Sequence, residues 1–357
     1  MKILGTGIIF TRGQGIGVLE NSLRSGWVKP AEMDVPRTEG NTRPVYQVDL
    51  DAVQDRSLLK KLRRADKLSK MSVLAAADAL ADSGIADIAR KKIGIILATA
   101  FGAQVTTFDF LDGILDYGDA AVSPTTFSNS VHNAAASYVS SSLNIRGPTL
   151  TVTQFRFSFQ SALQLAQTWL EQGRCDYLLA GAVDQYGDVL GYIAEQKLTA
   201  AQDGRIKPFV FNPTCQVPGE GALFFLLGND RTDSAYCSID SVSTSGDPDC
   251  GKPVDINLID ADGMLPDESA YLSALSPDTL TTAYAPIFGS MMIGGAFNLA
   301  TAALMLKQQT HYAAPVLDNP HALLLLSETG PAHIGSIRSI GCNCFGEKSV
   351  VYLSKLT

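Results

Sequence analysis

The stretch that decides the fold leads from a glycine–proline pair through a short strand to the start of a helix: Gly147-Pro148-Thr149-Leu150-Thr151-Val152-Thr153-Gln154-Phe155-Arg156. Residues 149–153 are typical of a strand. A helix is expected over residues 157–172, because Gly173 follows where a helix should stop. The apolar run at 177–180 predicts another strand. Strand, helix and strand in this order indicate a layered α/β protein.

The same alternation continues in both directions along the chain. Toward the N-terminus we expect a first strand at residues 1–7, a helix from Leu68 to Leu80 that stops at Gly84, and a buried strand at 93–98. The elements expected toward the C-terminus are strands at 222–227, 322–326 and 350–353 and a helix at 292–307. This pattern predicts mostly parallel sheets, and no linker rich in proline, glycine or serine separates the two halves of the chain.

Composition and charge exclude several classes of protein. Hydrophobic residues make up 46% of the 357 residues and charged residues 18%, which is typical of a compact globular protein. The net charge is -8, and the short basic cluster at residues 60–64 is explained by a solvated helix start, so nucleic-acid binding is not expected. We expect no signal peptide and no membrane span, which predicts a cytoplasmic protein. The six cysteines have no metal-ligand spacing, so we expect reduced thiols and neither a metal nor a cofactor.

Several segments resemble, in order, the motifs of the β-ketoacyl synthases, a family with the thiolase fold. They are residues 63–67, 75–84, 123–124, 147–152, 208–209, 218–222, 259–263 and 292–295. The resemblance covers about the whole chain. It implies two similar βαβαβ halves, residues 1–230 and 231–357, packed as one body with five αβαβα layers. It also implies a dimer.

The residues that carry the family's reaction are absent from these motifs. A condensing enzyme needs a cysteine at a helix start to hold the acyl chain, and two histidines, supported by a lysine, to stabilise the enolate. Aligning the motifs by this resemblance puts Arg156 at the cysteine, Asp262 and Gly295 at the histidines, and Ser290 at the lysine. Arginine stays protonated and cannot act as a nucleophile. The resemblance therefore implies a chain that has lost catalysis.

Other candidate residues do not restore a catalytic site. The family's glycine-rich gating loop is reduced to a remnant around Phe345 and Gly346, and the segment between Asp262 and Ser290 lacks the family's threonine-rich loop. Ser158 lies two residues past Arg156, about 200° around a helix, so it should face elsewhere. No nearby acid or base supports His132 as a catalytic group, and an interface or a hydrogen-bonded core position is expected for it.

Synthase relatives without the cysteine include the chain-length factors, which this chain resembles most, and among them the partner subunits of bacterial aryl polyene pathways. Such a subunit forms a heterodimer with an active synthase, works with acyl carrier protein through that complex, and shapes the tunnel for the growing chain. The residues implied at the tunnel and dimer interface are Phe108, Phe110, Leu111, Leu115, Phe127, His132, Thr151 and Thr153. The apolar residues of the 108–115 stripe could instead belong to an ordinary core helix.

Three alternatives remain open: a divergent active synthase or thiolase, a decarboxylase, and a stand-alone binding or scaffold protein. The first lacks a cysteine between Gly147 and Cys175, and the second would keep its histidines. The opposite charges of Arg156 and Asp262 further predict a buried ion pair. We expect this pair to fill the old substrate pocket, with Gly295 giving the arginine room.

Overall fold

The structure is a computed structural model that describes residues 1–35, 40, 42–53, 55–85, 92–229, 235–246, 252–266 and 268–356. Two predictions fall outside these ranges. One is the division of the chain at residue 230, and the other concerns Cys250, one of the six cysteines. The other five cysteines are free thiols.

The N-terminal half of the chain forms a five-stranded part of the sheet with the order β6-β5-β7-β8-β1. Its strands are β1 (Lys2–Phe10), β5 (Ile93–Thr99), β6 (Thr149–Thr153), β7 (Tyr177–Asp184) and β8 (Gly221–Gly228). Strand β5 is parallel to β6 and β7, whereas β8 is antiparallel to β7 and β1. The strand predicted at residues 149–153 is confirmed as β6.

The C-terminal half repeats this topology with the order β11-β10-β14-β15-β9. Its strands are β9 (Cys237–Ser243), β10 (Ile256–Ile259), β11 (Leu280–Thr282), β14 (Ser336–Cys342) and β15 (Lys348–Ser354). Again two pairings are parallel and two antiparallel. A short antiparallel pairing of β1 with β9 joins the two parts into one sheet. Each half therefore carries the same strand order and the same directions.

Two expectations about the strands are wrong. The sheet is mixed rather than mostly parallel. In the C-terminal half, β15 runs antiparallel to β14 because the turn between them is too short for the crossover that a parallel strand requires. Residues 322–326 do not form a strand, since only Leu325 makes an isolated bridge, to Thr281. The other expected strands and helices are present.

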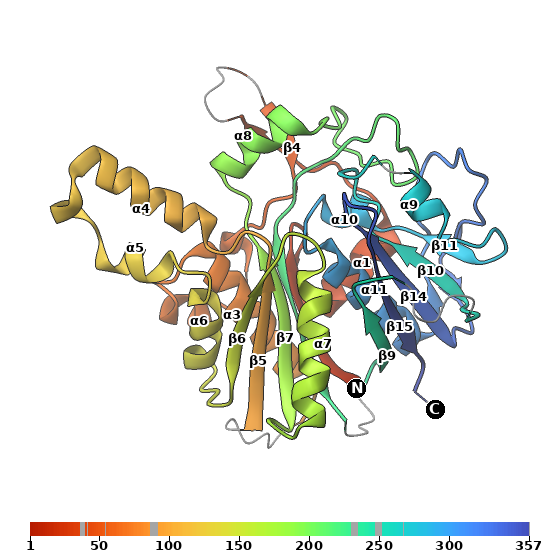
Figure 1. The fold of residues 1–357 in the computed structure, drawn as a ribbon, viewed down its shortest axis with the longest axis horizontal. Helices are drawn as coiled ribbons and strands as arrows, with labels where there is room; N and C mark the ends of the chain where they lie inside the picture. Colours follow the sequence, from red (N-terminus) through yellow and green to blue (C-terminus); the bar gives the residue numbers. More distant parts are fainter. Residues whose placement is uncertain are drawn as a thin grey trace.

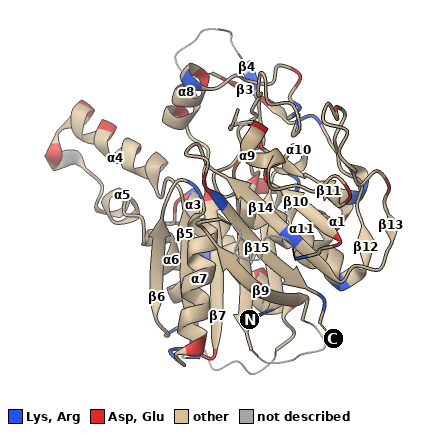
Figure 2. Cartoon of the chain, turned by 45° about the vertical axis from the view of Figure 1, so that its right-hand side comes forward, with Lys and Arg blue, Asp and Glu red and all other residues tan. Residues whose placement is uncertain are grey.

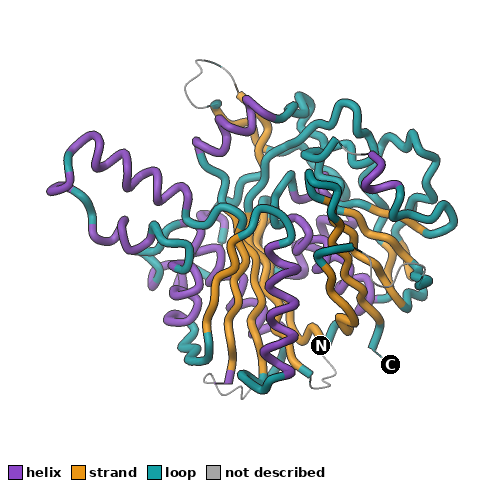
Figure 3. Tube along the Cα trace, in the orientation of Figure 1, coloured by secondary structure: helices purple, strands orange, loops and turns teal. Residues whose placement is uncertain are grey.

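Helices cover the sheet in layers, as Figures 1 and 3 show. The helices α7 (Ser158–Glu171) and α11 (Gly294–Gln308) lie in the middle and pack on both halves of the sheet. The outer face of the N-terminal half is covered by α3 (Lys67–Asp82) and α6 (Ala134–Ser142), and that of the C-terminal half by the much shorter α9 (Glu268–Leu272). The five-layer α/β arrangement is thus confirmed, with a thin outer layer on the C-terminal side.

Close packing of α3 on β1 depends on glycine. A Cβ atom at Gly7 would lie 1.9 Å from the backbone oxygen of Ala75, so no larger residue fits there without moving the helix. Asp66 caps the start of α3 by accepting a hydrogen bond from the backbone N–H of Ser69. This helix carries one of the family-like motifs and is fixed by both contacts.

Two helices project from the body as an arm, which extends to the left in Figure 1. The arm consists of α4 (Gln104–Tyr117) and α5 (Pro124–Asn129), whose rings Phe110 and Phe127 lie 5.4 Å apart between their centroids. A separate helix, α8 (Asp188–Lys197), stands above the sheet. Both features lie outside the layered core.

The remaining elements are short connections around the core. They are β2 (Gly13–Gln14), α1 (Ile16–Ser25), β3 (Ala31–Asp34), β4 (Thr42–Val45), η1 (Leu50–Ala52), α2 (Arg56–Lys61), η3 (Asp119–Ala121), α10 (Ala285–Phe288), β12 (Thr310–His311) and β13 (Gly330–Pro331). The basic cluster at residues 60–64 is exposed and lies at the end of α2, rather than at a helix start. Within the described ranges, no helix has the length and apolar character needed to span a membrane.

Candidate functional site

Arg156 lies in the turn between β6 and α7, at the start of the central helix. The next residue, Phe157, adopts a left-handed backbone conformation with φ 64° and is buried. Its ring is accommodated by Gly341, where a Cβ atom would lie 3.3 Å from the ring and 2.8 Å from Oδ2 of Asp260. The turn therefore directs Arg156 toward the loop that follows β10.

That loop presents two carboxylates to the guanidinium. Arg156 donates two hydrogen bonds to Asp262, of 3.2 Å to Oδ2 and 3.4 Å to Oδ1, and its Nη1 lies 3.6 Å from Oδ2 of Asp260. The exposed side-chain fractions are 13% for Arg156, 5% for Asp262 and 8% for Asp260. The predicted buried pair of Arg156 and Asp262 is confirmed as a contact. Its equivalence to the cysteine and histidine of active synthases stays a prediction.

Sequence reasoning missed Asp260. Its spacing of two residues from Asp262 could have indicated it, because residues two apart in an extended segment share one face. Tyr271 from α9 donates a hydrogen bond of 2.7 Å to Oδ1 of Asp260. The cluster therefore contains one cation, two carboxylates and a phenol.

The charges in this cluster stabilise one another. Burial alone would lower the pKa of Arg156, but the carboxylates of Asp262 and Asp260 raise it above its usual value. Burial raises the pKa of Asp260, against the opposing effect of Arg156. The guanidinium therefore remains protonated, and it cannot carry an acyl group.

Ser290 and Gly295 lie beside this cluster with different roles. The Ser290 hydroxyl accepts a hydrogen bond of 3.0 Å from Val217 N–H and donates one of 2.5 Å to the backbone oxygen of Asp262. Ser290 thus holds the backbone of Asp262 in place. The expectation that Gly295 gives Arg156 room is wrong, because the atoms closest to a Cβ there all belong to Gln160 on α7.

The residues predicted to be a remnant of the gating loop form a tight turn between β14 and β15. The side-chain oxygen of Asn343 accepts hydrogen bonds from the backbone N–H groups of Phe345 and Glu347, both of 3.0 Å. Gly346 supplies the positive φ of 77° that the turn requires. The Phe345 side chain is 84% exposed and points to solvent.

A cavity of about 390 Å³ remains next to Arg156 and Ser290. Rings and aliphatic side chains form most of its wall: Phe101, Phe155, Tyr186, Leu190, Ile193, Leu265, Met264, Met291 and Met292. The expectation that the ion pair fills the old pocket is therefore wrong. The carboxylates draw the guanidinium away, toward the loop after β10, and leave the space beside it open.

The apolar stripe of the arm is exposed rather than packed in a core. The exposed fractions are 37% for Phe108, 44% for Leu111, 81% for Leu115 and 58% for Phe127, and Phe110 is half-buried. The ordinary-core alternative is therefore wrong for this chain by itself. His132 is also exposed, with its ring against the backbone of Gly102, so the core position considered for it is wrong as well.

Strand β6 lies at one edge of the described sheet, and β11 lies at the other. The N–H of Gln154 donates a hydrogen bond to the backbone oxygen of Thr99 on the neighbouring strand β5. The N–H of Ile95 on β5 donates one to the backbone oxygen of Pro148. Because a parallel ladder uses alternate residues of each strand, the backbone groups of Thr149, Thr151 and Thr153 point away from β5. No described strand covers that side.

Two family-like motifs meet at a second buried ion pair. Lys67 at the start of α3 donates a hydrogen bond to Glu220, which is fully buried and also accepts from the backbone N–H groups of Val48 and Tyr186. Burial raises the pKa of Glu220, and Lys67 opposes that rise. This contact holds α3 to the segment before β8 and has a structural role.

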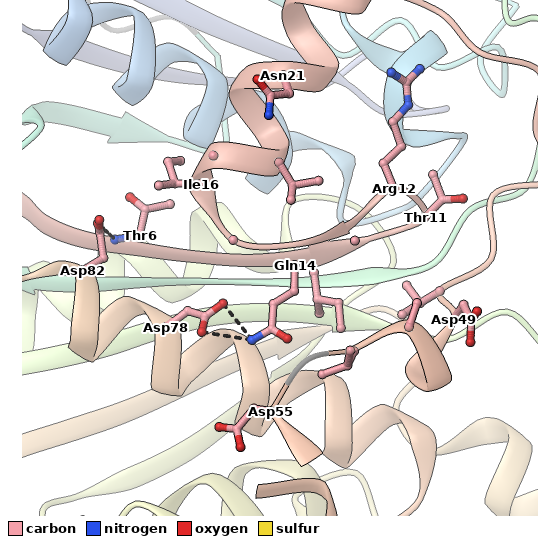
Figure 4. A pocket seen from close by; sticks show the side chains of 18 of the residues that line it. Thr6, Thr11, Arg12, Gln14, Ile16, Asn21, Asp49, Asp55, Asp78 and Asp82 are labelled. Atoms are coloured by element: carbon pink, nitrogen blue, oxygen red, sulfur yellow. Dashed lines mark hydrogen bonds between the residues drawn. The ribbon is translucent and has the colours of Figure 1, made fainter. Parts of the chain in front are cut away.

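A second cavity, of about 900 Å³, lies between β1, α1 and α3 and is shown in Figure 4. Gln14 donates hydrogen bonds of 2.9 and 3.0 Å to the carboxylate of Asp78, and burial raises the pKa of Asp78 to about 6. Arg12 points away from these groups in Figure 4 and binds the end of α1. Within the described ranges, no group of three or more His, Cys, Asp and Glu side chains is placed to hold a metal ion.

Comparison with known sequences identifies relatives of part of the chain. The sequence model of the family described as "Beta-ketoacyl synthase, N-terminal domain" matches residues 3–232. Nodulation protein E of Rhizobium meliloti (strain 1021) is 27% identical over 181 residues, which are 50% of this chain and 45% of that protein. The chain spans less than half the length of the curated relatives that it matches.

Solved structures show the same fold at low sequence identity. A β-ketoacyl synthase from Burkholderia phymatum STM815 is 17% identical and has a TM-score of 0.81, with 100% of both chains covered. A ketosynthase (ApeO) in complex with its chain length factor (ApeC), from Xenorhabdus doucetiae, is 14% identical with a TM-score of 0.78 and covers 99% of this chain and 98% of that one. The predicted thiolase fold is thereby confirmed.

Proposed function

The chain belongs to the β-ketoacyl synthase family, and we propose that within it this chain is a non-catalytic chain-length factor that forms a heterodimer with an active synthase. The observation that carries the proposal is Arg156 at the helix start, held by Asp262 and Asp260. A thiolate at such a position is activated by the positive end of the helix, whereas an arginine is repelled by it and needs the carboxylates.

The open edge of the sheet supports dimer formation. The outward backbone groups of Thr151 and Thr153 can pair with a strand of another subunit. Leu150 is 43% exposed and Phe155 65% exposed, so the edge also carries apolar side chains. A folded protein that leaves such an edge open as a monomer is prone to aggregation, which favours a stable partner.

The arm adds a second apolar surface. Leu115 and Tyr117 of α4 are 81% and 76% exposed, and Phe127 of α5, which lies against Phe110, is 58% exposed. Contiguous apolar surface of this kind is typical of protein interfaces. An obligate interface that includes both the edge and the arm should bury more than ~2,000 Å².

A solved complex with the same fold supports an active synthase as the proposed partner. In the Xenorhabdus doucetiae complex, a ketosynthase of the same fold is bound to its chain length factor. We assign the present chain the second role, in the cytoplasm, with acyl carrier protein engaged through the complex. The arm residues would then line the tunnel that holds a growing polyketide or aryl polyene chain, and the partner would perform the condensation.

Malonyl turnover by the purified chain tests the loss of catalysis. We expect no condensation and no decarboxylation of malonyl groups on acyl carrier protein above the rate in buffer, because no thiol occupies the helix start. An Arg156→Cys variant provides a matched control that restores the nucleophile alone. It should also remain inactive, since Asp262 and Gly295 supply no donors for the enolate. Turnover by the unmodified chain would refute the proposal and favour a divergent active enzyme.

A further inference from the structure

The cavity of about 900 Å³ between β1, α1 and α3 has an acidic wall. Its carboxylates belong to Asp49, Asp55, Asp78 and Asp82, and Arg12 is the one basic residue on the described part of this wall. The Arg12 guanidinium points away from them in Figure 4 and donates its hydrogen bonds at the end of α1. The wall therefore presents negative charge to the enclosed space.

Asp55 and Asp78 carry charge that no described cation offsets. The carboxylate of Asp78 accepts hydrogen bonds from the neutral amide of Gln14. Burial raises the pKa of Asp78, and the charges of Asp55 and Asp82 raise it further. Asp82 is partly offset by Lys307 on α11, whose pKa it raises against the effect of burial. Neither Asp55 nor Asp78 forms an ion pair with a described residue, so both can accept a cation from outside the chain.

A buried hydroxyl on the same wall also lacks a partner. Thr6 is 1% exposed, and its Oγ1 has no hydrogen-bond partner among the described residues. Figure 4 shows it beside Asp82, whose Oδ2 accepts a hydrogen bond of 2.8 Å from Thr6 N–H. An unpaired buried hydroxyl costs free energy. A ligand with N–H groups would use this oxygen as an acceptor.

The carboxylates are spread along the cavity rather than gathered at one point. Asp49 and Asp82 lie at opposite sides of the view in Figure 4. Among the described side chains, no three His, Cys, Asp or Glu residues are arranged to bind one metal ion. The wall also carries the aliphatic side chains of Ile9, Val48 and Val53. This arrangement fits an elongated organic cation with methylene groups better than a single metal ion.

The start of α1 faces the same cavity through Gly15, Ile16 and Gly17. A helix N-terminus carries about half a positive charge, which attracts anions. The four carboxylates outweigh that charge, so the cavity as a whole favours a cation.

From these features we propose that the cavity binds an aliphatic polyamine, with one ammonium group at Asp55 and Asp78 and another toward Asp49. An ammonium group donates three hydrogen bonds, and it stays charged at neutral pH as the lysine side chain does. The volume of the cavity lies in the range of small-molecule sites. The inference does not rest on the chain-length-factor proposal, because it needs neither a partner subunit nor catalysis.

Calorimetric titration of the full chain at low ionic strength tests this site. The probes are spermidine, 1,4-diaminobutane and 1-aminobutane, which carry three, two and one amino groups. We expect spermidine to bind at one site and 1-aminobutane to bind at least ~10-fold more weakly, with the diamine between them. Failure of spermidine to bind, equal affinity for the monoamine, or displacement of spermidine by an equal concentration of magnesium chloride would overturn the proposal.

Two kinds of variant locate the ligand. Asp78→Asn should weaken spermidine at least ~5-fold, whereas Asp318→Asn, which removes the same charge from a surface carboxylate paired with Lys207, should leave the affinity unchanged. Ala81→Phe should exclude spermidine by filling the cavity, and Ala52→Phe is a second filling variant should the first unfold.

Two results with these variants would refute the site. If spermidine binds Asp78→Asn and a folded filling variant as it binds the parent, the ligand lies elsewhere and the proposal is wrong. An equal loss in Asp318→Asn and Asp78→Asn would attribute binding to the net charge of the protein, which also overturns the proposal.

Discussion

Replacement of Arg156 by methionine removes the one cation from a cluster that holds two buried carboxylates. Methionine has an unbranched side chain, like the aliphatic part of arginine, and it fills irregular space well. The main change is therefore the loss of charge. Asp262 and Asp260 are 5% and 8% exposed in their side chains, and water can therefore replace little of the lost interaction.

The magnitude follows from which charges are left without a partner. Removing one member of a buried ion pair typically lowers the free energy of unfolding by about 3–5 kcal/mol. Arg156→Met strands two carboxylates, which places the expected loss at about 4–5 kcal/mol. Asp262→Asn leaves no buried charge without a partner, because Arg156 still lies 3.6 Å from the carboxylate of Asp260. The side-chain oxygen of the new asparagine can still accept the hydrogen bond from Met264 N–H. We expect that variant to lose only about 1–2 kcal/mol.

Urea unfolding, followed by circular dichroism at about pH 8 and about pH 5.5, measures both variants. In Arg156→Met the pKa of Asp260, which burial already raises, loses the opposing effect of Arg156 and rises further above its value in the unfolded state. The folded state then binds more protons, so the deficit should shrink as the pH falls. Arg24→Met, which removes a surface arginine paired with Glu20, is the matched control and should leave the midpoint unchanged.

Two results would refute this reasoning. One is an Arg156→Met variant that unfolds at the same urea concentration as the parent at both pH values. The other is a larger loss in Asp262→Asn than in Arg156→Met, since a simple two-residue pair would then describe the site better than a cluster with two carboxylates.

Three further predictions concern the arm, the edge strand and a second buried carboxylate. Phe108→Ala and Leu111→Trp should shift the length of the product made by the assembled complex without preventing its assembly; an unchanged product distribution would mean that the stripe does not reach the tunnel. Thr151→Pro removes an outward N–H of β6 and should abolish heterodimer formation in size-exclusion chromatography while the fold persists, whereas Val152→Pro removes a bond to β5 and should destabilise the chain itself. Asp184 is buried and burial raises its pKa from 3.8 to about 6, so the stability that depends on its neutral form is lost as the pH rises through about 6. Asp184→Asn should remove a falling slope of up to about 1.4 kcal/mol per pH unit from the unfolding free energy between pH 3.8 and about 6, and an unchanged slope would assign it to other groups.

The local pattern of the sequence predicts the elements around the site well. Residues 149–153 form β6 and the following helix ends one residue before its predicted end, because both segments are bounded by glycine and differ clearly in pattern. The contact of Arg156 with Asp262 follows from charge and family position together. Both features are determined by residues close together in the sequence or by their positions in the family motifs.

Other features depend on contacts between distant segments, and the sequence pattern does not predict them. Asp260 joins the cluster because the loop after β10 stays extended, and Gln160 occupies the space at Gly295 because α7 and α11 pack side by side. The exposure of Leu115 follows from the arm standing away from the core, although the residue is as apolar as a core residue. Periodicity along the chain carries no information about how far a helix stands from its neighbours.

Co-expression of this chain with a catalytically competent synthase, followed by size-exclusion chromatography with mass measurement, tests the central claim most directly. The account predicts one complex with the mass of a one-to-one heterodimer, and greater solubility of this chain than when it is expressed alone. A chain that remains a monomer or forms only a homodimer in the presence of synthases from its own pathway would contradict the account and favour a stand-alone binding or scaffold protein.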